Sequence, residues 1–399
     1  MIMEPKNWNV YLFRDILERV EVPVNVESNK EYVQIGIRSH GKGLFYKEPV
    51  LGKALGNKQV FWIQPNCFIL NVVFAWEQAI TKTTENEIGM IGSHRFPMYR
   101  PKNDLVDIDY LIYYFLTKRG TDILEAASPG GAGRNRTLGQ ERFLKSKITL
   151  PTLPEQQKIA AILSTQDKVI ELKEKLLVQK QQQKKHLMQQ LLTGKRRLPG
   201  FGGEWKTIHL NEISCRIETK NTVGNNNVLT ISAQYGLINQ TEFFDKVIAS
   251  DDKSNYYLLS KDEFAYNRSY SKGYPYGTIK RLKRYVQGVV SPLYICFAVN
   301  KNLASLDFLE QYFETSIINR EIQSIVQEGA RNHGMLNVAV DDFFRIKITM
   351  PEIEEQKEIA KILSTADHEI DLLQKSIEAE KQKKKALMQL LLMGKVRVK

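Results

Sequence analysis

The chain has 399 residues, 42% of them hydrophobic and 10% aromatic, which is enough apolar surface for folded cores and excludes a chain that is disordered throughout. Lysine and arginine exceed aspartate and glutamate by 57 − 45 = 12, and the pI is about 9.3. A surplus of this size favours a polyanionic partner, and nucleic acid is the first candidate. A basic surface that only aids solubility is the alternative.

The sequence has no signature of secretion, membrane insertion or metal binding. Cys67, Cys215 and Cys296 are far apart and have no Cys-x-x-Cys spacing, which predicts neither disulfides nor zinc and favours a reducing compartment. The six histidines have no metal-ligand spacing. The N-terminus lacks an apolar signal segment and no run approaches 18 apolar residues, so we expect a cytoplasmic protein.

Residues 1–150 are predicted to form a mixed α/β domain. The opening segment, Trp8–Ile16, has the apolar spacing of a short helix or turn that docks on the domain. Tyr32–Tyr46 and Val60–Phe74 are rich in β-branched and aromatic residues, which predicts strands. Ile108–Thr117 has apolar residues at helical spacing and predicts a helix.

A long helix is predicted for residues 151–196. Thr152 and Glu155 have the spacing of a capping box. Gly194 follows the last apolar residues, where a glycine commonly ends a helix. About 40 helical residues at ~1.5 Å each form a rod of roughly 60 Å.

The second half of the chain repeats this organisation, with a domain at 197–350 and a long helix at 351–399. The sequence KITLPTLPEQQKIAAILSTQD at 147–167 returns as KITMPEIEEQKEIAKILSTAD at 347–367, an offset of 200. The tryptophans that open the two halves are offset by only 205 − 8 = 197. A period this long indicates two domain-sized halves and excludes a solenoid of short repeats.

The second domain has its own pattern of strands and helices. Trp205–Ile213 repeats the opening segment of the first half. Val228–Ser232, Thr278–Leu282 and Val289–Val299 predict strands. Leu306–Ile317 predicts a helix.

Each long helix carries an apolar face with heptad spacing. We expect the two faces to pair as an antiparallel coiled coil with a pseudo-twofold axis, because the second helix returns after one intervening domain. Two separate surface helices, each packed on its own domain, are the alternative. The predicted fold class is therefore α+β, with two mixed α/β domains separated by two long antiparallel coiled-coil helices. The pairing face consists of Ile159, Leu163, Ile170, Leu177, Leu187, Leu191, Ile359, Leu363, Ile370, Leu373, Ile377, Leu387 and Leu391.

Clusters of polar and basic residues in the first domain are candidates for DNA contact. The stretch Gly36–Gly43 nearly matches a phosphate-binding P-loop, but Gly43 stands where that loop requires Ser or Thr. We therefore interpret it as a glycine-rich turn that carries basic side chains toward a phosphate backbone. The candidates in this half are Arg38, His40, Lys42, Ser93, His94, Arg95, Arg134, Asn135 and Arg136.

The second domain has a related set. Arg331 lies 331 − 134 = 197 residues after Arg134, again beside a glycine-rich segment. Arginine and asparagine can make bidentate contacts with guanine and adenine edges, although a loop arginine that bonds a carboxylate is an equal alternative. Tyrosines alternate with cations from Asn267 to Tyr276, which suits a nucleic-acid surface; packed tyrosines beside a solvated basic face are the alternative. The candidates are Arg268, Tyr270, Lys272, Tyr274, Lys280, Arg281, Arg331, Asn332 and His333.

No constellation of residues points to catalysis. The chain has no Asn-Pro-Pro-aromatic motif of adenine methyltransferases, no helicase motif and no convincing nuclease set of carboxylates and lysine. We predict no catalytic residue and no metal site. A self-sufficient DNA enzyme is a competing hypothesis, which activity of the chain alone would support.

The repeated motif resembles that of a known family. A variable domain followed by Leu150–Gln166 (LPTLPEQQKIAAILSTQ) and a long helix ending LLTGK, all repeated once, is similar to the specificity subunit of type I restriction–modification systems. The resemblance covers essentially the whole chain. The second copy has Glu352 and Glu354 in place of Thr152 and Pro154.

The resemblance implies a non-catalytic DNA reader from a bacterium or archaeon. Each domain would read one half of a bipartite, asymmetric DNA site, and the helices would set the gap and dock two methyltransferase subunits. Those subunits would methylate adenine N6 with S-adenosylmethionine, and two restriction subunits that use ATP and Mg²⁺ could join. No cofactor is expected on this chain. The alternative is a coiled-coil assembly protein with nonspecific nucleic-acid binding.

Overall fold

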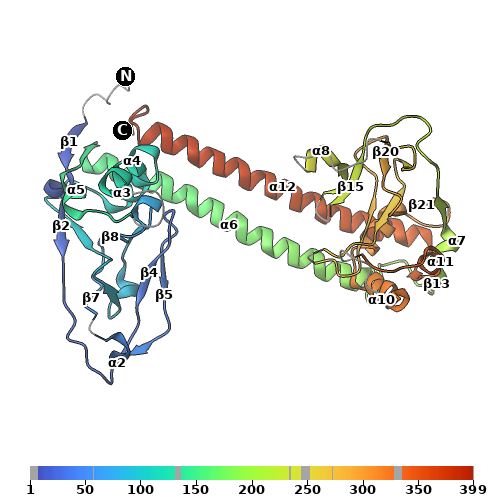
Figure 1. Cartoon of the computed structure of the whole chain (residues 1–399), viewed down its shortest axis with the longest axis horizontal. Helices are drawn as coiled ribbons and strands as arrows, with labels where there is room; N and C mark the ends of the chain where they lie inside the picture. The colour runs from blue at the N-terminus through green and yellow to red at the C-terminus, as the bar shows by residue number, and fades with distance from the viewer. Residues whose placement is uncertain are drawn as a thin grey trace. The chain divides into compact units, whose positions relative to one another are not determined.

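The computed structural model describes residues 8–56, 58–130, 136–232, 235–243, 252–271, 273–327 and 335–398. The chain divides into two compact units. Unit 1 contains Met1–Glu174 and Lys375–Lys399, and unit 2 contains Lys175–Gln374. The two long helices, α6 (Leu153–Leu191) and α12 (Ile353–Leu391), each begin in one unit and end in the other (Figure 1).

Unit 1 contains small antiparallel sheets. The largest described sheet has four strands in the order β2-β11-β8-β9, and the remaining strands pair as β1 with β12, β3 with β6, β4 with β5, and β7 with β10. The strands are β1 (Asn9–Leu12), β2 (Leu17–Val20), β3 (Glu31–Tyr32), β4 (Ile35–Ile37), β5 (Leu44–Tyr46), β6 (Val50–Leu51), β7 (Val60–Trp62), β8 (Phe68–Leu70), β9 (Ile80–Lys82), β10 (Ile91–Ser93), β11 (Met98–Pro101) and β12 (Lys147–Leu150).

Most short helices of unit 1 share a core with its four-stranded sheet. Phe13, Phe68, Phe115 and Phe143 stack with ring centroids between 4.7 and 6.3 Å apart, and all four are fully buried. The helices are α1 (Phe13–Ile16), α2 (Gly52–Leu55), α3 (Ile108–Phe115), α4 (Lys118–Ala127) and α5 (Gln140–Lys145), with the 3-10 turns η1 (Ala75–Glu77) and η2 (Glu85–Glu87).

Unit 2 has a similar design. Its four-stranded sheet has the order β14-β21-β18-β19, and β13 pairs with β22, β15 with β16, and β17 with β20. The strands are β13 (Lys206–His209), β14 (Ser214–Ile217), β15 (Leu229–Ser232), β16 (Gly236–Asn239), β17 (Tyr257–Ser260), β18 (Phe264–Asn267), β19 (Thr278–Arg281), β20 (Gln287–Val290), β21 (Ile295–Val299) and β22 (Lys347–Met350). The helices are α7 (Leu210–Ile213), α8 (Gln240–Phe243), α9 (Leu306–Tyr312), α10 (Ser316–Ile325) and α11 (Val340–Phe344).

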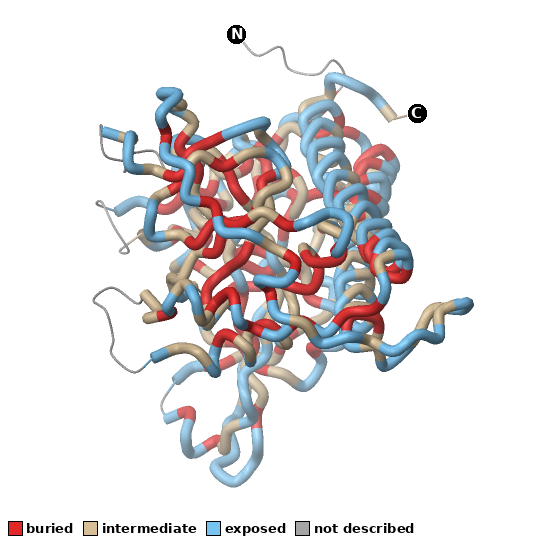
Figure 2. The backbone as a smooth tube through the Cα atoms, turned by 90° about the vertical axis from the view of Figure 1, so that its right-hand side faces the viewer, coloured by how far each residue is buried: buried red, intermediate tan, exposed pale blue. Residues whose placement is uncertain are grey.

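Buried residues follow the strands and the helix faces that cover them, whereas turns and the outer helix faces are exposed (Figure 2). The core of unit 2 again joins aromatic rings. Phe264 stacks on Phe297 at 5.3 Å, and Tyr266 stacks on Phe343 at 4.8 Å.

The opening segments differ from their prediction as a short helix or turn. Each is a strand followed by a single helical turn, β1 with α1 and β13 with α7. The strands form because their partners come from the repeated motif itself: β12 and β22 are its KITL and KITM sequences. A pairing partner about 140 residues away overrides the local helical spacing.

The two predicted domain helices end earlier than predicted. Ile108–Thr117 and Leu306–Ile317 each run across a break between two helices. Thr117 occupies the N-cap of α4, where its hydroxyl accepts a hydrogen bond from Gly120 N at 3.3 Å. A threonine favours this position because its side chain satisfies an otherwise unpaired helix N–H.

The prediction of two long helices is confirmed, with 39 residues in each. All thirteen residues assigned to the pairing face are buried or half-buried. In each unit, the N-terminal part of one long helix packs antiparallel to the C-terminal part of the other: Asp167 bonds Lys384 in unit 1, and Asp367 bonds Lys184 in unit 2. The predicted α+β fold class with antiparallel long helices is therefore confirmed.

Candidate DNA interface and helix junctions

The C-terminal end of each long helix packs into the core of the unit in which the other long helix begins. Leu391 and Leu392 are buried in the core of unit 1, beside Ile159 and Leu163. Leu191 and Leu192 hold the equivalent place in unit 2. The near-copied LLTGK and LLMGK sequences thus fill two equivalent sites.

A glycine ends each of these helices, as predicted. Gly194 has φ +67° and Gly394 has φ +64°. Residues with a Cβ rarely adopt this left-handed conformation, which lets the chain leave the helix.

A buried carboxylate in the first turn of each long helix holds an arginine that follows the end of the other. Glu155 accepts bonds from Nε and Nη2 of Arg397, both at 2.7 Å. Glu355, whose side chain is fully buried, accepts bonds from the same atoms of Arg197 at 2.8 and 2.7 Å. The carboxylate assigned to a capping box from its spacing with Thr152 therefore serves as an arginine receptor.

Sequence reasoning overlooked these arginines. Arg197 and Arg397 share the 200-residue offset and lie two residues beyond the repeated LLTGK and LLMGK motifs. Their common offset is the sequence signal that identifies them as part of the repeat.

A buried glutamine follows each of these glutamates and holds main-chain groups of the adjacent domain. Gln156 Nε2 donates to the carbonyls of Leu105 and Pro151, both at 2.9 Å, and its Oε1 accepts from Asp107 N at 2.9 Å. Gln356 likewise donates to Pro351 O and accepts from Ser305 N. Each glutamine fixes its helix to the loop before α3 or α9.

An aspartate–lysine pair joins the two long helices within each unit. In unit 1, Asp167 pairs with Lys384 at 2.5 Å and accepts a bond from the Tyr113 hydroxyl at 2.8 Å. Burial, followed by the hydrogen bond to Asp167, raises the pKa of Tyr113. In unit 2, Asp367 pairs with Lys184 at 2.6 Å and accepts from Gln311 Nε2 at 2.7 Å.

Polar residues interrupt the apolar face in unit 1, and they bond one another. Gln166 Nε2 and Lys173 Nζ each donate to the carboxylate of Glu380 at 2.8 Å. These two hydrogen bonds, Lys173 first, lower the pKa of Glu380 to about 2. The polar residues that interrupt the heptad pattern therefore satisfy one another's hydrogen bonds across the two helices.

This contact predicts an acid-sensitive contribution to stability. The pKa of Glu380 is lower in the folded chain than its ordinary value of 4.5, so its contribution is fully present above about pH 4.5 and is lost as the pH falls toward 2. We expect Glu380→Gln to unfold with a weaker dependence on pH than the unmodified chain over this range. Tm measured between pH 5 and 2.5 checks this, and parallel curves for the two proteins would contradict it.

The turn of the β4–β5 hairpin carries three DNA candidates of the first domain. The Phe45 ring packs over Gly36, where a Cβ would lie 2.2 Å from it. Arg38 donates to the Leu44 carbonyl, and its guanidinium lies 5.3 Å from the Phe45 ring centroid. His40 and Lys42 are exposed on the turn, where they can reach a phosphate.

The other described candidates of the first domain lie in two places. Ser93 shapes the turn between β10 and β11, since its hydroxyl accepts a bond from Arg95 N at 3.2 Å. His94 and Arg95 are exposed on that turn. The Arg136 guanidinium lies 5.5 Å from the Trp76 ring centroid.

In the second domain, the candidate cations that the structure describes, Arg268, Lys280 and Arg281, already have partners. Arg268 donates to the carbonyls of Leu293 and Val338. The Arg281 side chain, 8% exposed, pairs with Asp307 at 2.7 Å. Packing within the unit accounts for both side chains, so we leave them out of the proposed DNA surface.

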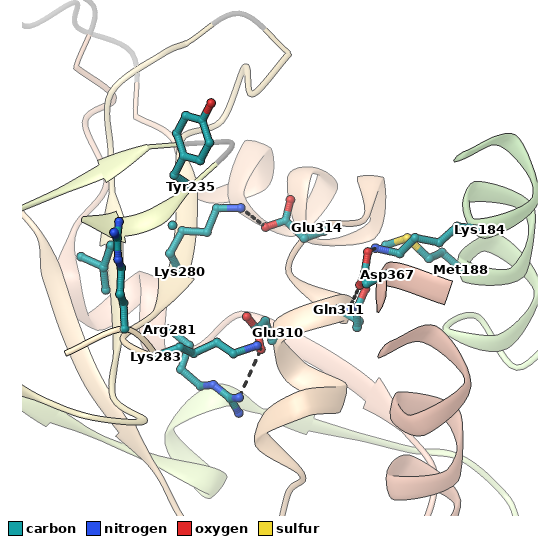
Figure 3. Close-up of a pocket in the computed structure, with 13 residues that line it drawn as sticks. Lys184, Met188, Tyr235, Lys280, Arg281, Lys283, Glu310, Gln311, Glu314 and Asp367 are labelled. Atoms are coloured by element: carbon teal, nitrogen blue, oxygen red, sulfur yellow. Dashed lines mark hydrogen bonds and ion pairs between the residues drawn. The ribbon is translucent and has the colours of Figure 1, made fainter. Parts of the chain in front are cut away.

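A surface cavity of about 520 Å³ in unit 2 adjoins these residues. Lys280 pairs with Glu314 on one wall, and Lys184 reaches Asp367 on another (Figure 3). Tyr274 also bonds Glu314, and its pKa is raised to about 12 by burial and then by this carboxylate. Tyr270, by contrast, is 64% exposed and can offer its ring to a base.

Six candidates lie outside the described residues: Arg134, Asn135, Lys272, Arg331, Asn332 and His333. The DNA contacts assigned to them, and to the described candidates, stay predictions. Within the described part of the chain, no group of three or more His, Cys, Asp or Glu residues could hold a metal ion. None of the helices in the described ranges is long and apolar enough to cross a membrane.

Comparisons with known proteins agree with this architecture. The model of the type I restriction modification DNA specificity domain matches residues 25–180 and 204–381. The type I restriction enzyme MjaVIII specificity subunit of Methanocaldococcus jannaschii is 24% identical, over 99% of this chain and 94% of that protein.

Two solved structures are similar in fold. The HsdS subunit from Thermoanaerobacter tengcongensis has a TM-score of 0.57 and 16% identity, covering 98% of each chain. The second is a chain from a study of complex assembly and conformational transition in a type I R-M system. It has a TM-score of 0.58 and 16% identity, covering 99% of this chain and 100% of that one.

Two unlike domains, each followed by a long helix, and two matches to one domain family define a DNA-specificity protein. The chain belongs to the family of type I restriction–modification DNA specificity subunits.

Proposed function

We propose that each domain of this chain reads one half of a bipartite, asymmetric DNA site for a type I restriction–modification complex. One observation carries the proposal. The helix junctions of the two units are near-copies, with Glu155–Arg397 matched by Glu355–Arg197, whereas the domains attached to them differ in sequence. Repeated junctions suit a common scaffold, and different domains suit unlike half-sites.

One exposed turn and one exposed tyrosine supply candidate contacts. His40 and Lys42 on the β4–β5 turn suit phosphate contacts, which provide affinity but no sequence choice. The exposed ring of Tyr270 suits stacking on a base or sugar. The net charge of +12 favours association with DNA in either case.

The long helices would set the gap between the half-sites and dock two methyltransferase subunits. The thirteen apolar residues predicted to form their pairing face are buried or half-buried, and we expect them to pair the helices and to leave the outer faces for partners. The methyltransferase subunits would bring S-adenosylmethionine for adenine N6 methylation. Two restriction subunits that use ATP and Mg²⁺ could complete the complex. This chain would hold no cofactor and perform no chemistry itself.

The test compares the chain alone with the chain plus its methyltransferase subunits. We expect methyl transfer to DNA only from the assembled complex, and tighter binding to duplexes with the target site than to scrambled duplexes at physiological salt. Methylation by the chain alone would contradict the absence of catalysis. Equal affinity for all duplexes would contradict sequence reading.

Lys42→Ala is expected to weaken DNA binding equally for target and scrambled duplexes. Loss of one phosphate contact lowers the slope of log K against log salt by about 1. The measurement is the salt dependence of binding by the assembled complex. Lys168→Ala removes an exposed lysine of α6 and serves as the control, which should keep the original slope. An unchanged slope in Lys42→Ala would remove this turn from the DNA surface.

A further inference from the structure

The middle of the long helices carries charges that differ between the two copies. In unit 1, Lys173 of α6 donates to Glu380 and to Ser376 of α12, both at 2.8 Å. Glu174 pairs with Lys381 at 2.7 Å. The side chains of Lys173 and Glu380 are 28% and 20% exposed, so water screens this pair only in part.

The equivalent places in unit 2 hold different residues. Position 373, which corresponds to Lys173, is leucine, and position 180, which corresponds to Glu380, is lysine. Lys180 pairs instead with Glu369 at 2.8 Å. The residue that corresponds to Glu369 in α6 is Val169. Each unit thus has its own ion pair, and each pair joins α6 to α12.

The two junction pairs toward the helix ends do not distinguish the helices. Glu155–Arg397 and Glu355–Arg197 are equivalent, as are Asp167–Lys384 and Asp367–Lys184. Each helix carries the same acid near its start and the same base near its end. These contacts would therefore form equally well if a helix paired with a second copy of itself.

The middle charges do distinguish them. If α6 paired with α6 of a second copy, Lys180 would stand in the place of Glu380 and face Lys173. If α12 paired with another α12, Glu380 would stand in the place of Lys180 and face Glu369. Both like-with-like pairings bring equal charges together, which is unfavourable. The repulsion is stronger for α6 with α6, because the side chains of Lys180 and Glu369 are 37% and 50% exposed and water screens their site more.

We propose that residues 173, 180, 369 and 380 form a pairing code that makes α6 accept α12 and reject a second copy of itself. The end junctions stabilise any pairing, and the code selects the partner. Its consequence is that a scaffold always joins one first domain to one second domain. Helix pairing of this kind is independent of the proposed DNA contacts.

Exchanging the residues at 180 and 380 reverses the code without altering composition or net charge. In Lys180→Glu with Glu380→Lys, position 380 repels Lys173 and position 180 repels Glu369, whereas both like-with-like pairings become attractive. We expect Tm of the full chain to fall by about 5 °C. We also expect light scattering to detect a concentration-dependent species of twice the 46.0 kDa chain mass.

A fourfold variant restores the original pairing. Adding Lys173→Glu and Glu369→Lys makes both α6–α12 contacts attractive again, so Tm and the monomeric mass should return toward those of the unmodified chain. The matched control exchanges Lys158 and Glu358, which are also 200 residues apart and exposed. Lys158→Glu with Glu358→Lys should leave both measurements unchanged.

A double variant that stays monomeric with the Tm of the control would overturn the proposal, as would one that loses stability without forming the dimer. If the double variant is too unstable to isolate, the fourfold variant decides. Recovery of the original Tm and mass supports the code, and failure to recover overturns it.

Discussion

Gln156→Leu is expected to destabilise the first domain strongly, although the substitution adds apolar surface to a buried site. The lost amide satisfies the carbonyls of Leu105 and Pro151 and the N–H of Asp107, and Gln156 is fully buried. A buried group left without a partner costs about 1–3 kcal/mol, so three of them cost roughly 3–5 kcal/mol after some relaxation. That is a large share of the stability of one domain.

The adjacent residue provides the control. Gln157 is exposed on the same turn of α6, and Gln157→Leu should change the free energy of unfolding by about 0.5 kcal/mol or less. Urea unfolding of both variants measures the difference. Equal stability of the two leucine variants would show that Gln156 does not anchor the helix to the loop before α3.

Leu392→Ala is expected to destabilise a domain that ends about 240 residues earlier in the sequence. Leu392 is 1% exposed in the core of unit 1, and truncation of a buried leucine costs about 2–5 kcal/mol. Hydrogen exchange should therefore accelerate in α3 and β11 of unit 1, but not in β18 and β21 of unit 2. Leu192→Ala, at the equivalent site of unit 2, should produce the reverse pattern.

Leu390→Ala is the control for this pair because Leu390 is 40% exposed. It should change hydrogen exchange in neither unit by more than a small factor. Faster exchange in unit 2 for Leu392→Ala would contradict the assignment of each helix end to the opposite domain.

Much of the fold follows from the sequence because the two halves of the chain repeat and can be compared with each other. The 200-residue offset predicted both long helices, which the structure contains. Heptad spacing predicted a pairing face whose residues are buried or half-buried. Gly194 and Gly394 fulfilled their predicted role because a helix end needs a left-handed residue. The strands β1 and β13 could not be predicted locally, because each depends on a partner at the far end of its domain.

The candidate site was less predictable, because composition does not say which cations already have partners. Arg268 and Arg281 were predicted as DNA contacts because they lie near tyrosines in the sequence. In the structure, Arg268 donates to backbone carbonyls and Arg281 pairs with acids of α9. Asp307 and Glu310 lie 26 and 29 residues after Arg281, so no local sequence pattern links them to it. His40, Lys42 and Tyr270 remain exposed, and their role in DNA contact stays a prediction.

If the helices fix the distance between the two half-sites, shortening both helices should shorten the gap in the DNA site. Removing residues 172–178 and 372–378 takes seven residues from each helix while contacts such as Gln166–Glu380 and Lys180–Glu369 keep their partners. Seven residues at ~1.5 Å shorten the pair by about 10 Å, or roughly three base pairs. The measurement is a map of methylated adenines in DNA modified by the assembled complex. We expect the same two half-sites with a gap about three base pairs shorter. An unchanged gap would show that the helices do not fix the distance between the half-sites.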